Sequence, residues 1–468
     1  MSNFEPFSAQ PTFSFFMRPF TLTFSRILSL GFVVVFLLVT SCATDESKWR
    51  PKVENPAHFH KTMKAITDRI VFDIFSPPVA SRIYAYSSIA AYEAGRHADS
   101  TLVSLAGQLK QMPEMPKPEP GKVYSYPLAA LQALYKTGKT LIFSEDVLEQ
   151  YYSDLTEELK SSGIPSDVWE RSVNFGNAVS DAVIKWSSTD NYKQTRSFPK
   201  YTILKDPGTW KPTPPAYMDA VEPHWNKIRT LVIDSAAQFR TEPPTPFSTE
   251  KGSAFYKLAE EVLEVRKSLT DEQKEIASFW DCNPFMMNVN GHVMFANKKI
   301  SPGGHWINIT SQACIKEQLT TARSAEAYTW TAVALFEGFI SCWDEKYRSR
   351  LVRPETYINT YIDEDWTPWL QTPPFPEHTS GHSTISGASS EVLTVLFGDN
   401  FAFTDSTERE FAIPDRSFTS FRHAAEEAAI SRFFGGIHYR PANELGLKSG
   451  REIGNYLVSR IRTRRQQD

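Results

Sequence analysis

Cysteine is scarce in this chain, with only four among 468 residues: Cys42, Cys282, Cys314 and Cys342. No two of them form a Cys-x-x-Cys pair, and this absence argues against a structural zinc site. If Cys42 is chemically modified, three thiols remain, and they cannot all pair. We therefore expect mostly buried thiols, with at most one disulfide in an oxidising compartment.

A dominant charge is missing as well. The 50 basic and 54 acidic residues leave a net charge of −4. Without a basic field over the whole protein, nucleic acid is not an expected partner. Beyond the N-terminal region, no apolar run approaches the roughly 20 residues that span a bilayer. Any anion site must therefore be a local cluster of cations, and the body of the protein is expected to be soluble.

The N-terminal region has the pattern of a secretion signal. The apolar run 28–39 follows Arg18 and Arg26, and Thr40-Ser41-Cys42 comes directly after it. The stretch ending at Cys42 resembles the lipobox of bacterial lipoproteins. We expect a lipoprotein signal over 1–41 and a protein anchored through Cys42 at the bacterial cell envelope, on its periplasmic or outer-membrane face. A plain signal peptide and a single membrane anchor are the alternatives, and the membrane, the leaflet and the start codon (Met1 or Met17) stay open.

The remainder of the chain is predicted to be helical. After a polar tether over 42–56, apolar residues recur at three- and four-residue intervals. No sustained period-2 alternation and no internal repeat interrupts this pattern, so the fold class is mainly α, a multi-helix bundle over 57–468. Residues 195–250 and 280–308 are expected to be loops. The predicted helices include residues 79–97, 127–143, 145–162, 167–188, 251–279, 311–341 and 420–434.

Three short segments in the last third of the chain carry candidate chemistry. In the first, Lys346 precedes Arg353 by seven residues and Pro354 follows. On one continuous helix, seven residues make two turns, about 10.5 Å with a net rotation of about 20°. Both cations would then lie on one face and reach the same anion. The plain alternative is a solvated basic face, since Arg348 and Arg350 lie nearby.

The second segment is Ser380-Gly381-His382, which stands between a proline-rich stretch and an apolar helical one. A serine at this place is a good helix cap, and the first N–H groups of the helix would point outward with the positive end of its dipole. Such an end binds oxyanions, and Gly381 permits a close approach. An ordinary capped helix with an incidental histidine is the alternative.

The third segment is Ser431-Arg432, followed by Gly435-Gly436 and His438. The glycine pair ends the preceding helix, so His438 belongs to the next turn rather than to a helix face. A histidine in such a turn is well placed to face a cavity. A buried histidine with a purely structural role is the alternative.

Together, the order and spacing of these segments resemble the signature of the vanadium haloperoxidases and the type 2 phosphatidic acid phosphatase superfamily. In that pattern, a lysine precedes an arginine-proline pair with six residues between them. A Pro-Ser-Gly-His segment follows, and then a Ser-Arg pair with a histidine after five more residues. The resemblance covers 346–438 closely and places an oxyanion site within 343–443. Upstream, 82–97 and the Gly303-Gly304-His305-Trp306 loop resemble the bacterial haloperoxidases.

The resemblance implies a role for each matching residue. The cations would hold the equatorial oxygens of vanadate or phosphate, with Ser380 and the Gly381 N–H completing the cradle. His438 would be the apical ligand of vanadium, or the nucleophile on phosphorus, and His382 the acid–base group. The implied cations are Lys346, Arg353 and Arg432.

The same pocket permits two reactions and leaves three hypotheses. One is a haloperoxidase that uses vanadate, hydrogen peroxide and a halide. Another is an acid phosphatase that acts on soluble phosphate esters through a phosphohistidine, and a third is a non-catalytic oxyanion-binding lipoprotein. Trp343 and Phe375 resemble the aromatic residues beside the halide in fungal chloroperoxidases and favour the first. The oligomeric state stays open.

The sequence departs from the family pattern at two places. Thr379 stands where the family has proline, and Ala442 stands where it has an acidic residue. Asn443 or Glu444 is considered as a substitute partner for Arg432. Asp281 is considered as the residue that orients His382.

Overall fold

The computed structural model of the chain describes residues 12, 14, 46–290, 292–296 and 298–465. The expected signal sequence over 1–41 and the lipidated Cys42 lie outside the described residues, apart from residues 12 and 14. Small hydroxyl residues cap many of the helices, and proline often follows at the first or second helical position, where its missing N–H costs nothing. Ser76, Ser125 and Ser301 show both features.

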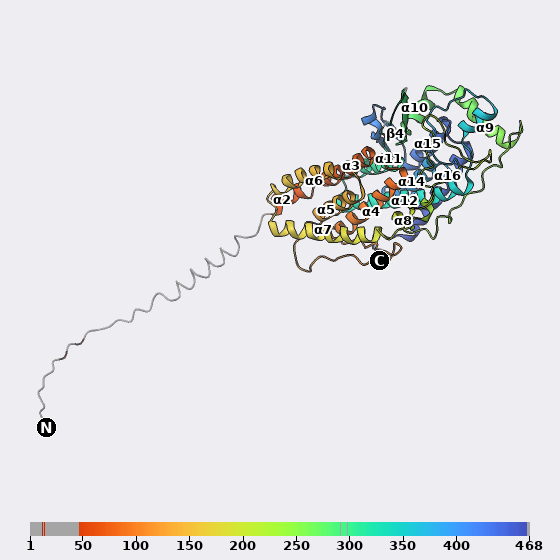
Figure 1. Cartoon of the computed structure of the whole chain (residues 1–468). Helices are drawn as coiled ribbons and strands as arrows, with labels where there is room; N and C mark the ends of the chain where they lie inside the picture. Colours follow the sequence, from red (N-terminus) through yellow and green to blue (C-terminus); the bar gives the residue numbers. More distant parts are fainter. Residues whose placement is uncertain (1–11, 13, 15–45, 291, 297, 466–468) are drawn as a thin grey trace. The chain divides into compact units, whose positions relative to one another are not determined.

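The predicted mainly α class is confirmed (Figure 1). Short 3-10 turns η2 (Arg96–Ala98), η3 (Trp225–Lys227) and η4 (Thr407–Phe411) join some of the elements. The α-helices of the first half are α2 (Glu46–Val53), α3 (Pro56–Phe72), α4 (Pro77–Gly95), α5 (Tyr126–Leu141), α6 (Glu145–Lys160), α7 (Ser166–Ser187) and α8 (Tyr192–Thr195). Those of the second half are α9 (Ala254–Lys267), α10 (Asp271–Phe279), α11 (Pro302–Lys316), α12 (Thr321–Ser349), α13 (Pro354–Tyr361), α14 (Gly381–Phe397), α15 (Phe421–Phe434) and α16 (Arg440–Arg460).

Helix α12 is the centre of the bundle. It is 29 residues long, and all of its residues from Ser324 to Tyr347 are buried. It packs against both α4 and α14, while α4 also packs against α5, and α5 against α7. Helix α14 in turn packs against α15 and α16. The long apolar helix therefore connects the N-terminal helices with the group that carries the three predicted segments.

Glycine allows α14 and α16 to approach each other closely. A Cβ atom on Gly450 would lie 2.0 Å from the carbonyl oxygen of Thr384, and one on Gly387 would lie 2.6 Å from that of Leu447. Neither contact is sterically allowed, so only glycine fits at these positions. This close contact fixes the position of α14, whose first turn carries Gly381 and His382.

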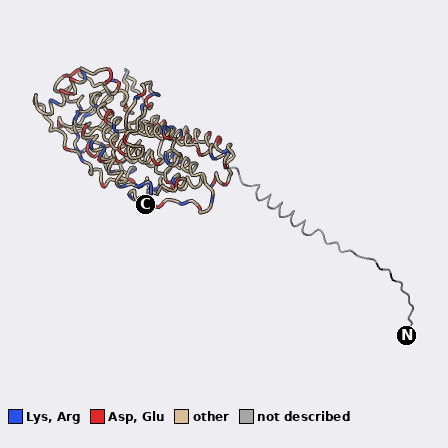
Figure 2. Tube along the Cα trace, turned by 180° about the vertical axis from the view of Figure 1, so that it is seen from behind, with Lys and Arg blue, Asp and Glu red and all other residues tan. Residues whose placement is uncertain are grey.

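Two small hairpins supplement the helices. Strand β1 (Met287–Asn290) pairs antiparallel with β2 (Val293–Ala296), with Met287 opposite Ala296. Strand β3 (Phe403–Asp405) pairs antiparallel with β4 (Arg416–Phe418), with Phe403 opposite Phe418. Among the described residues, no helix is both long enough and apolar enough to cross a bilayer. Both Lys and Arg and Asp and Glu are scattered over the trace in the view of Figure 2, as expected from the nearly balanced charge.

The predicted helices 251–279 and 311–341 are each divided between two helices, α9 and α10 in the first range and α11 and α12 in the second. Three further expectations from the sequence differ from the structure. Residues 46–53 of the expected tether form α2, whose Trp49 and Val53 are buried. The expected loop 280–308 contains the first hairpin and the start of α11, so Gly303-Gly304-His305-Trp306 is a helical turn. Ser301 caps α11 and Pro302 is its first residue, so these two residues mark the start of a helix and not a continuing loop.

The third difference concerns Lys346 and Arg353, which do not share a helix. Helix α12 ends at Ser349, and Arg350 adopts a left-handed conformation with φ 54°. Arg353 is extended with ψ 153°, because the residue before a proline avoids the helical region, and Pro354 opens α13. Lys346 and Arg353 therefore do not share one helix face as predicted, although both side chains are buried and approach the same loop, 375–379.

Candidate functional site

A pocket is lined by residues of the second and third predicted segments, whereas Lys346 and Arg353 of the first segment lie outside its lining and reach it through their contacts with the 375–379 loop and His438. Its empty volume is about 480 Å³, part of which is open to solvent. Gly381, His382, Arg432 and His438 line it. The rest of its wall is largely apolar and includes Pro77, Pro284, Phe285, Pro302, Phe339, Trp343, Pro373, Phe375 and Ile437.

Each element delivers its side chain for a local reason. Helix α12 carries Lys346, and the Pro354 that opens α13 holds Arg353 extended before it. Ser380 caps α14 by accepting a hydrogen bond from the Ser383 N–H at 3.3 Å. Arg432 lies in the last turn of α15, and His438 lies in the short connection from α15 to α16.

His438 is held in one tautomer. Its Nδ1 lies 2.8 Å from Glu377 Oε1, and Arg353 Nη1 lies 3.0 Å from its Nε2. A guanidinium can only donate, so Nε2 must accept and Nδ1 must carry the proton that is donated to Glu377. The lone pair of Nε2 therefore faces the cationic side of the site. Glu377 was not among the residues predicted from the sequence, although its place in the proline-rich stretch five residues before His382 marks it as a candidate.

The electrostatics keep the His438 ring neutral. Burial, reinforced by Arg353, Lys346 and Arg432, lowers the pKa of His438 well below its usual value. Burial raises the pKa of the Glu377 carboxyl to about 7, with Arg353 and Lys346 opposing this shift. A neutral imidazole with an unprotonated Nε2 can ligate a metal or an electrophilic centre once that centre replaces the hydrogen bond from Arg353.

Arg353 is almost fully engaged with the backbone. Its Nε donates to the carbonyl of Phe375 at 2.9 Å, and its Nη1 also donates to that of Ile437 at 2.8 Å. Its Nη2 is buried and has no hydrogen-bond partner among the described residues. The two backbone contacts fix the guanidinium plane and leave Nη2, with its two N–H groups, available to a ligand.

Arg432 and His382 also carry unpaired polar atoms. Arg432 Nη1 donates to the carbonyl of Trp280, and its Nη2 lies 3.8 Å from Asp281 Oδ1. The Nε of Arg432 and the Nε2 of His382 are buried, and within the described chain neither has a hydrogen-bond partner. Burial, followed by the charge of Arg432, lowers the pKa of His382 well below its usual value.

Asp281 has another role than the one considered from the sequence. Its Oδ2 lies 2.7 Å from Lys299 Nζ, and its Oδ1 is the carboxylate oxygen near Arg432. The backbone of Trp280, rather than Asp281, is hydrogen-bonded to His382. Asn443 Nδ2 donates to the Tyr439 carbonyl at 3.4 Å, and in the described structure neither Asn443 nor Glu444 pairs with Arg432. Asp281 is therefore the acidic partner of Arg432, and a residue 151 positions upstream is not visible in local spacing.

Lys346 differs from the two arginines because its donors are occupied. Its Nζ lies 2.9 Å from the carbonyl oxygen of Pro376, 3.0 Å from that of Glu377 and 2.5 Å from that of Thr379. An ammonium has three N–H donors, so these carbonyls use all of them. Burial lowers the pKa of Lys346 to about 7. Its charge acts on the pocket from behind the 376–379 loop.

The backbone at the start of α14 adds further donors. Gly381 and His382 occupy the first helical positions, where N–H groups have no partner within the helix. Neither N–H donates to an acceptor among the described residues. Gly381 also lines the pocket directly, and a Cβ atom there would lie 3.5 Å from the Trp343 ring.

Two of the aromatic residues singled out in the sequence form one wall. The ring centroids of Trp343 and Phe375 are 5.0 Å apart with an interplanar angle of 50°. The Phe375 ring also lies 5.1 Å from both Lys346 Nζ and the Arg353 guanidinium carbon. This wall combines an apolar surface with a buried positive charge behind it.

The donors present fit a tetrahedral oxyanion. Arg353 Nη2 and Arg432 Nε are buried donor atoms without partners in the described chain, and leaving such atoms unpaired costs about 1–3 kcal/mol each. An anion with several acceptor oxygens would satisfy them together with the first N–H groups of α14. The arrangement can bind an oxyanion, exclude water from it and offer it one imidazole lone pair.

Comparison with protein families agrees with this geometry. Residues 326–467 match the family model described as the VCPO second helical-bundle domain. That range begins within α12 and includes all three predicted segments. A search of curated protein sequences finds no significant match.

Comparison with solved structures covers most of the chain. A structure described as the first bacterial vanadium-dependent iodoperoxidase is 48% identical, with a TM-score of 0.84, over 89% of this chain and 99% of that one. A bacterial vanadium-dependent chloroperoxidase in its apo form is 17% identical, with a TM-score of 0.63, over 82% and 94%. Its holo form is 19% identical, with a TM-score of 0.62, over 83% and 93%. The two chloroperoxidase structures share the fold with this chain, and the iodoperoxidase also shares much of its sequence.

Proposed function

Because this chain belongs to the vanadium-dependent haloperoxidase family of oxidoreductases, we propose that it oxidises iodide with hydrogen peroxide in the pocket around His438. One observation supports this proposal most directly. Arg353, Arg432 and His382 each carry a buried polar atom without a partner in the described chain, and they accompany His438, whose Nε2 is held unprotonated by Glu377 and Arg353. The geometry fits a tetrahedral oxyanion, and the family comparison supports vanadate as that anion.

The residues of the pocket suggest how vanadate would be held. The Nε2 of His438 would ligate vanadium, while Arg353, Arg432, Ser380 and the Gly381 N–H would bind the oxygens. Lys346 would contribute positive charge from behind the loop rather than a direct hydrogen bond, since carbonyls occupy its donors. When bound, vanadate supplies a Lewis acid that activates hydrogen peroxide toward a halide.

The protein's own residues prepare this chemistry. Glu377 accepts a hydrogen bond from the Nδ1–H of His438 and so keeps Nε2 unprotonated. The lowered pKa of His382 keeps its ring neutral, and its Nε2 meets no protein group in the described chain. It can take a proton from an incoming peroxide and later return it, as a general acid–base must. The apolar wall excludes bulk water, which strengthens each of these interactions.

Iodide fits this wall better than a smaller halide. The pocket is lined by Phe285, Phe339, Trp343 and Phe375, and Trp343 and Phe375 are the proposed halide contacts. A large, weakly hydrated anion loses less hydration energy than a small one when it enters an apolar site. The arginines and Lys346 behind the rings supply the positive charge that an anion requires. The 48% identity with a bacterial iodoperoxidase agrees with this preference.

The proposal is tested with purified protein reconstituted with orthovanadate. We expect triiodide to form from iodide and hydrogen peroxide, with slower turnover of bromide and chloride. Vanadium should be retained at about one equivalent per chain, measured by elemental analysis. Hydrolysis of p-nitrophenyl phosphate without any halide oxidation would indicate the phosphatase alternative. Sulfate binding with no turnover in either assay would indicate a non-catalytic oxyanion-binding protein.

We also propose that the protein is a lipoprotein of the bacterial envelope, anchored through Cys42. The support comes from the sequence, in which an apolar run and small residues precede that cysteine. Mass spectrometry of the mature N-terminus should find a lipid-modified Cys42, and Cys42→Ser should release the protein from the membrane fraction. An unmodified N-terminus or cleavage at another site would contradict the anchor.

A further inference from the structure

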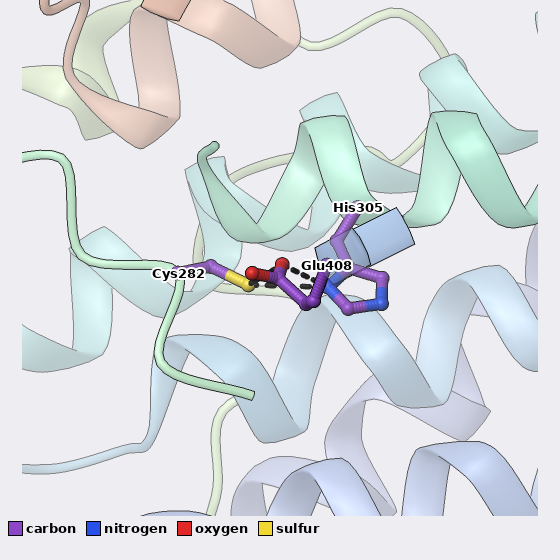
Figure 3. Close-up of side chains that lie close together, drawn as sticks. All are labelled: Cys282, His305 and Glu408. Carbon is purple, nitrogen blue, oxygen red and sulfur yellow. Dashed lines mark hydrogen bonds and ion pairs between the residues drawn. The ribbon is translucent and has the colours of Figure 1, made fainter. Parts of the chain in front are cut away.

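A second cluster of ligand-type side chains lies beside the pocket. Cys282, His305 and Glu408 meet in the interior, and their side chains point toward one another (Figure 3). All three are buried, with exposed fractions of 1%, 0% and 1%. They come from three separate segments: the loop after α10, the first turn of α11, and η4. The haloperoxidase chemistry proposed above uses none of them.

The donor atoms form a triangle of the size that one metal ion requires. Cys282 Sγ lies 3.2 Å from His305 Nδ1, His305 Nδ1 lies 3.1 Å from Glu408 Oε1, and Cys282 Sγ lies 3.7 Å from Glu408 Oε1. A tetrahedral zinc ion with sulfur at about 2.3 Å and nitrogen or oxygen at about 2.0–2.2 Å separates its ligands by about 3.3–3.6 Å. The three separations bracket that range, so only small shifts would accommodate the ion.

The surroundings of His305 prepare it as a ligand. Its Nε2 lies 2.7 Å from Asp405 Oδ2, so the remaining nitrogen, Nδ1, faces the thiol and the carboxylate. Asp405 is itself anchored, because its Oδ1 accepts from Gln312 Nε2 at 3.1 Å and from the Thr407 N–H at 2.9 Å. A carboxylate behind a histidine is the arrangement that orients and strengthens metal-binding imidazoles.

One buried atom in the cluster also lacks a partner. Glu408 Oε2 has no hydrogen-bond partner within the described chain, although the residue is 1% exposed. A buried carboxylate oxygen without a partner is costly, and a cation bound by this carboxylate would remove that cost. Hydrogen bonds alone account for His305 and Cys282, but they leave this oxygen unexplained.

We propose that Cys282, His305 and Glu408 bind one Zn²⁺ ion, with Asp405 positioning His305. One thiolate, one imidazole and one carboxylate form a ligand set that suits zinc, and a thiolate and a carboxylate together neutralise its charge. Absence of a Cys-x-x-Cys pair does not argue against this site, because its ligands lie 23 and 103 residues apart along the chain, at positions 282, 305 and 408. The fourth position is available to the second oxygen of Glu408 or to water.

The zinc would stabilise one wall of the oxyanion pocket. Cys282 lines that pocket, and Trp280, two residues earlier, accepts a hydrogen bond from Arg432 through its carbonyl. The indole of Trp280 also stacks on the His305 ring, with centroids 4.6 Å apart. An ion held by Cys282 and His305 would therefore fix the segment 280–282 that positions Arg432.

Elemental analysis tests the site on the full protein. The chain is produced in zinc-supplemented medium, because a closed site fills as the protein folds, and it is purified under reducing conditions. We expect about one equivalent of zinc per chain, and X-ray absorption at the zinc edge should show one sulfur ligand. Zinc below a tenth of an equivalent, or zinc without a sulfur ligand, would overturn the proposal.

Variants identify the ligands. Cys282→Ser and Glu408→Gln should each reduce retained zinc at least tenfold after dialysis against a chelator. Cys314→Ser is the matched control, because Cys314 is also a buried free thiol but lies outside the cluster. Full zinc retention by Cys282→Ser would refute the assignment. Because the wild-type measurement of sulfur in the zinc shell needs no variant, the site stays testable even if a variant fails to fold.

Discussion

Two buried histidines of this protein share one arrangement and are surrounded by opposite charges. His438 donates from Nδ1 to Glu377 at 2.8 Å, and His305 donates from Nε2 to Asp405 at 2.7 Å. The other nitrogen of His438 meets the guanidinium of Arg353 at 3.0 Å. The other nitrogen of His305 meets the thiol of Cys282 at 3.2 Å and a carboxylate oxygen of Glu408 at 3.1 Å.

The difference shows what a histidine–carboxylate pair decides and what it does not. The carboxylate selects the tautomer and directs one lone pair toward a site. The groups around that lone pair decide the charge of the ligand. Cations with free donors surround His438 and select an oxyanion, whereas sulfur and oxygen acceptors surround His305 and select a metal cation. A histidine–carboxylate pair by itself would not tell an oxyanion site from a metal-cation site.

Removal of the His438 imidazole should have the largest effect on activity, and it should affect the oxyanion site without affecting the zinc site. His438→Ala deletes the proposed vanadium ligand while the arginines remain, so iodide oxidation should fall by about a thousandfold or more. Vanadium retention, measured by elemental analysis, should fall with it, and zinc content should not change. His423→Ala, at an exposed histidine, is the control. Iodide oxidation unchanged in His438→Ala would show that the site is assigned wrongly.

Substitution of the carboxylate behind each histidine should have the next largest effect. Each substitution should weaken binding at its own site and not at the other. Glu377→Gln should weaken vanadate binding by about ten- to a hundredfold and leave zinc content unchanged, because partners behind a ligating histidine contribute this much to affinity. Asp405→Asn should weaken zinc binding by a similar factor and leave vanadate affinity less affected. Elemental analysis of both variants after dialysis at several metal concentrations measures both effects. If either substitution lowered both metals equally, the two sites would not be independent.

Prediction from the sequence was strongest where information is local. The ends of α4, α5, α6 and α7 lie within about two residues of their predicted ranges, because caps and apolar periodicity are local features. The mainly α class and the haloperoxidase resemblance are confirmed. The start of α14 at Gly381, with Ser380 as its cap, was also visible in local sequence.

Partners between distant segments were not visible. Glu377 contacts His438 from 61 residues away, and Asp281 contacts Arg432 from 151 residues away. The pairing of Cys282 with Glu408 spans 126 residues. Such contacts depend on how the helices pack rather than on spacing, and a single sequence has no periodicity that reports them. The same reason explains why the shared face expected for Lys346 and Arg353 was wrong.

The pH dependence of anion binding should show a smaller effect. Burial lowers the pKa of Lys346 to about 7, and a bound anion would raise it by favouring the ammonium. Anion affinity is therefore full below about pH 7 and falls above it, by roughly fivefold between pH 7 and pH 8 for one such group. Calorimetry with sulfate measures this, because sulfate remains a dianion throughout that range.

The contribution of Glu377 to this pH dependence must be distinguished from that of Lys346. Burial raises the pKa of Glu377 to about 7, so its ionisation above pH 7 weakens anion binding in the same direction. The pH dependence that remains in Glu377→Gln should belong to Lys346, and Lys346→Met in that background should remove it. A flat profile in the wild-type protein between pH 6 and pH 9 would contradict both assignments.

The aromatic wall should give the smallest effect and the finest distinction within the oxyanion pocket. Phe375 and Phe339 both line that pocket, but only Phe375 faces cations, at 5.1 Å from Lys346 Nζ and from the Arg353 guanidinium carbon. A cation–π contact contributes about 0.5–1 kcal/mol, so Phe375→Leu should raise the KM for iodide about two- to fivefold with little change in kcat. Phe339→Leu removes a ring of the same size without a cation beside it, and its KM should change less. Equal changes in the two variants would mean that the wall acts only by excluding water, and that the charge selecting an anion comes from the arginines alone.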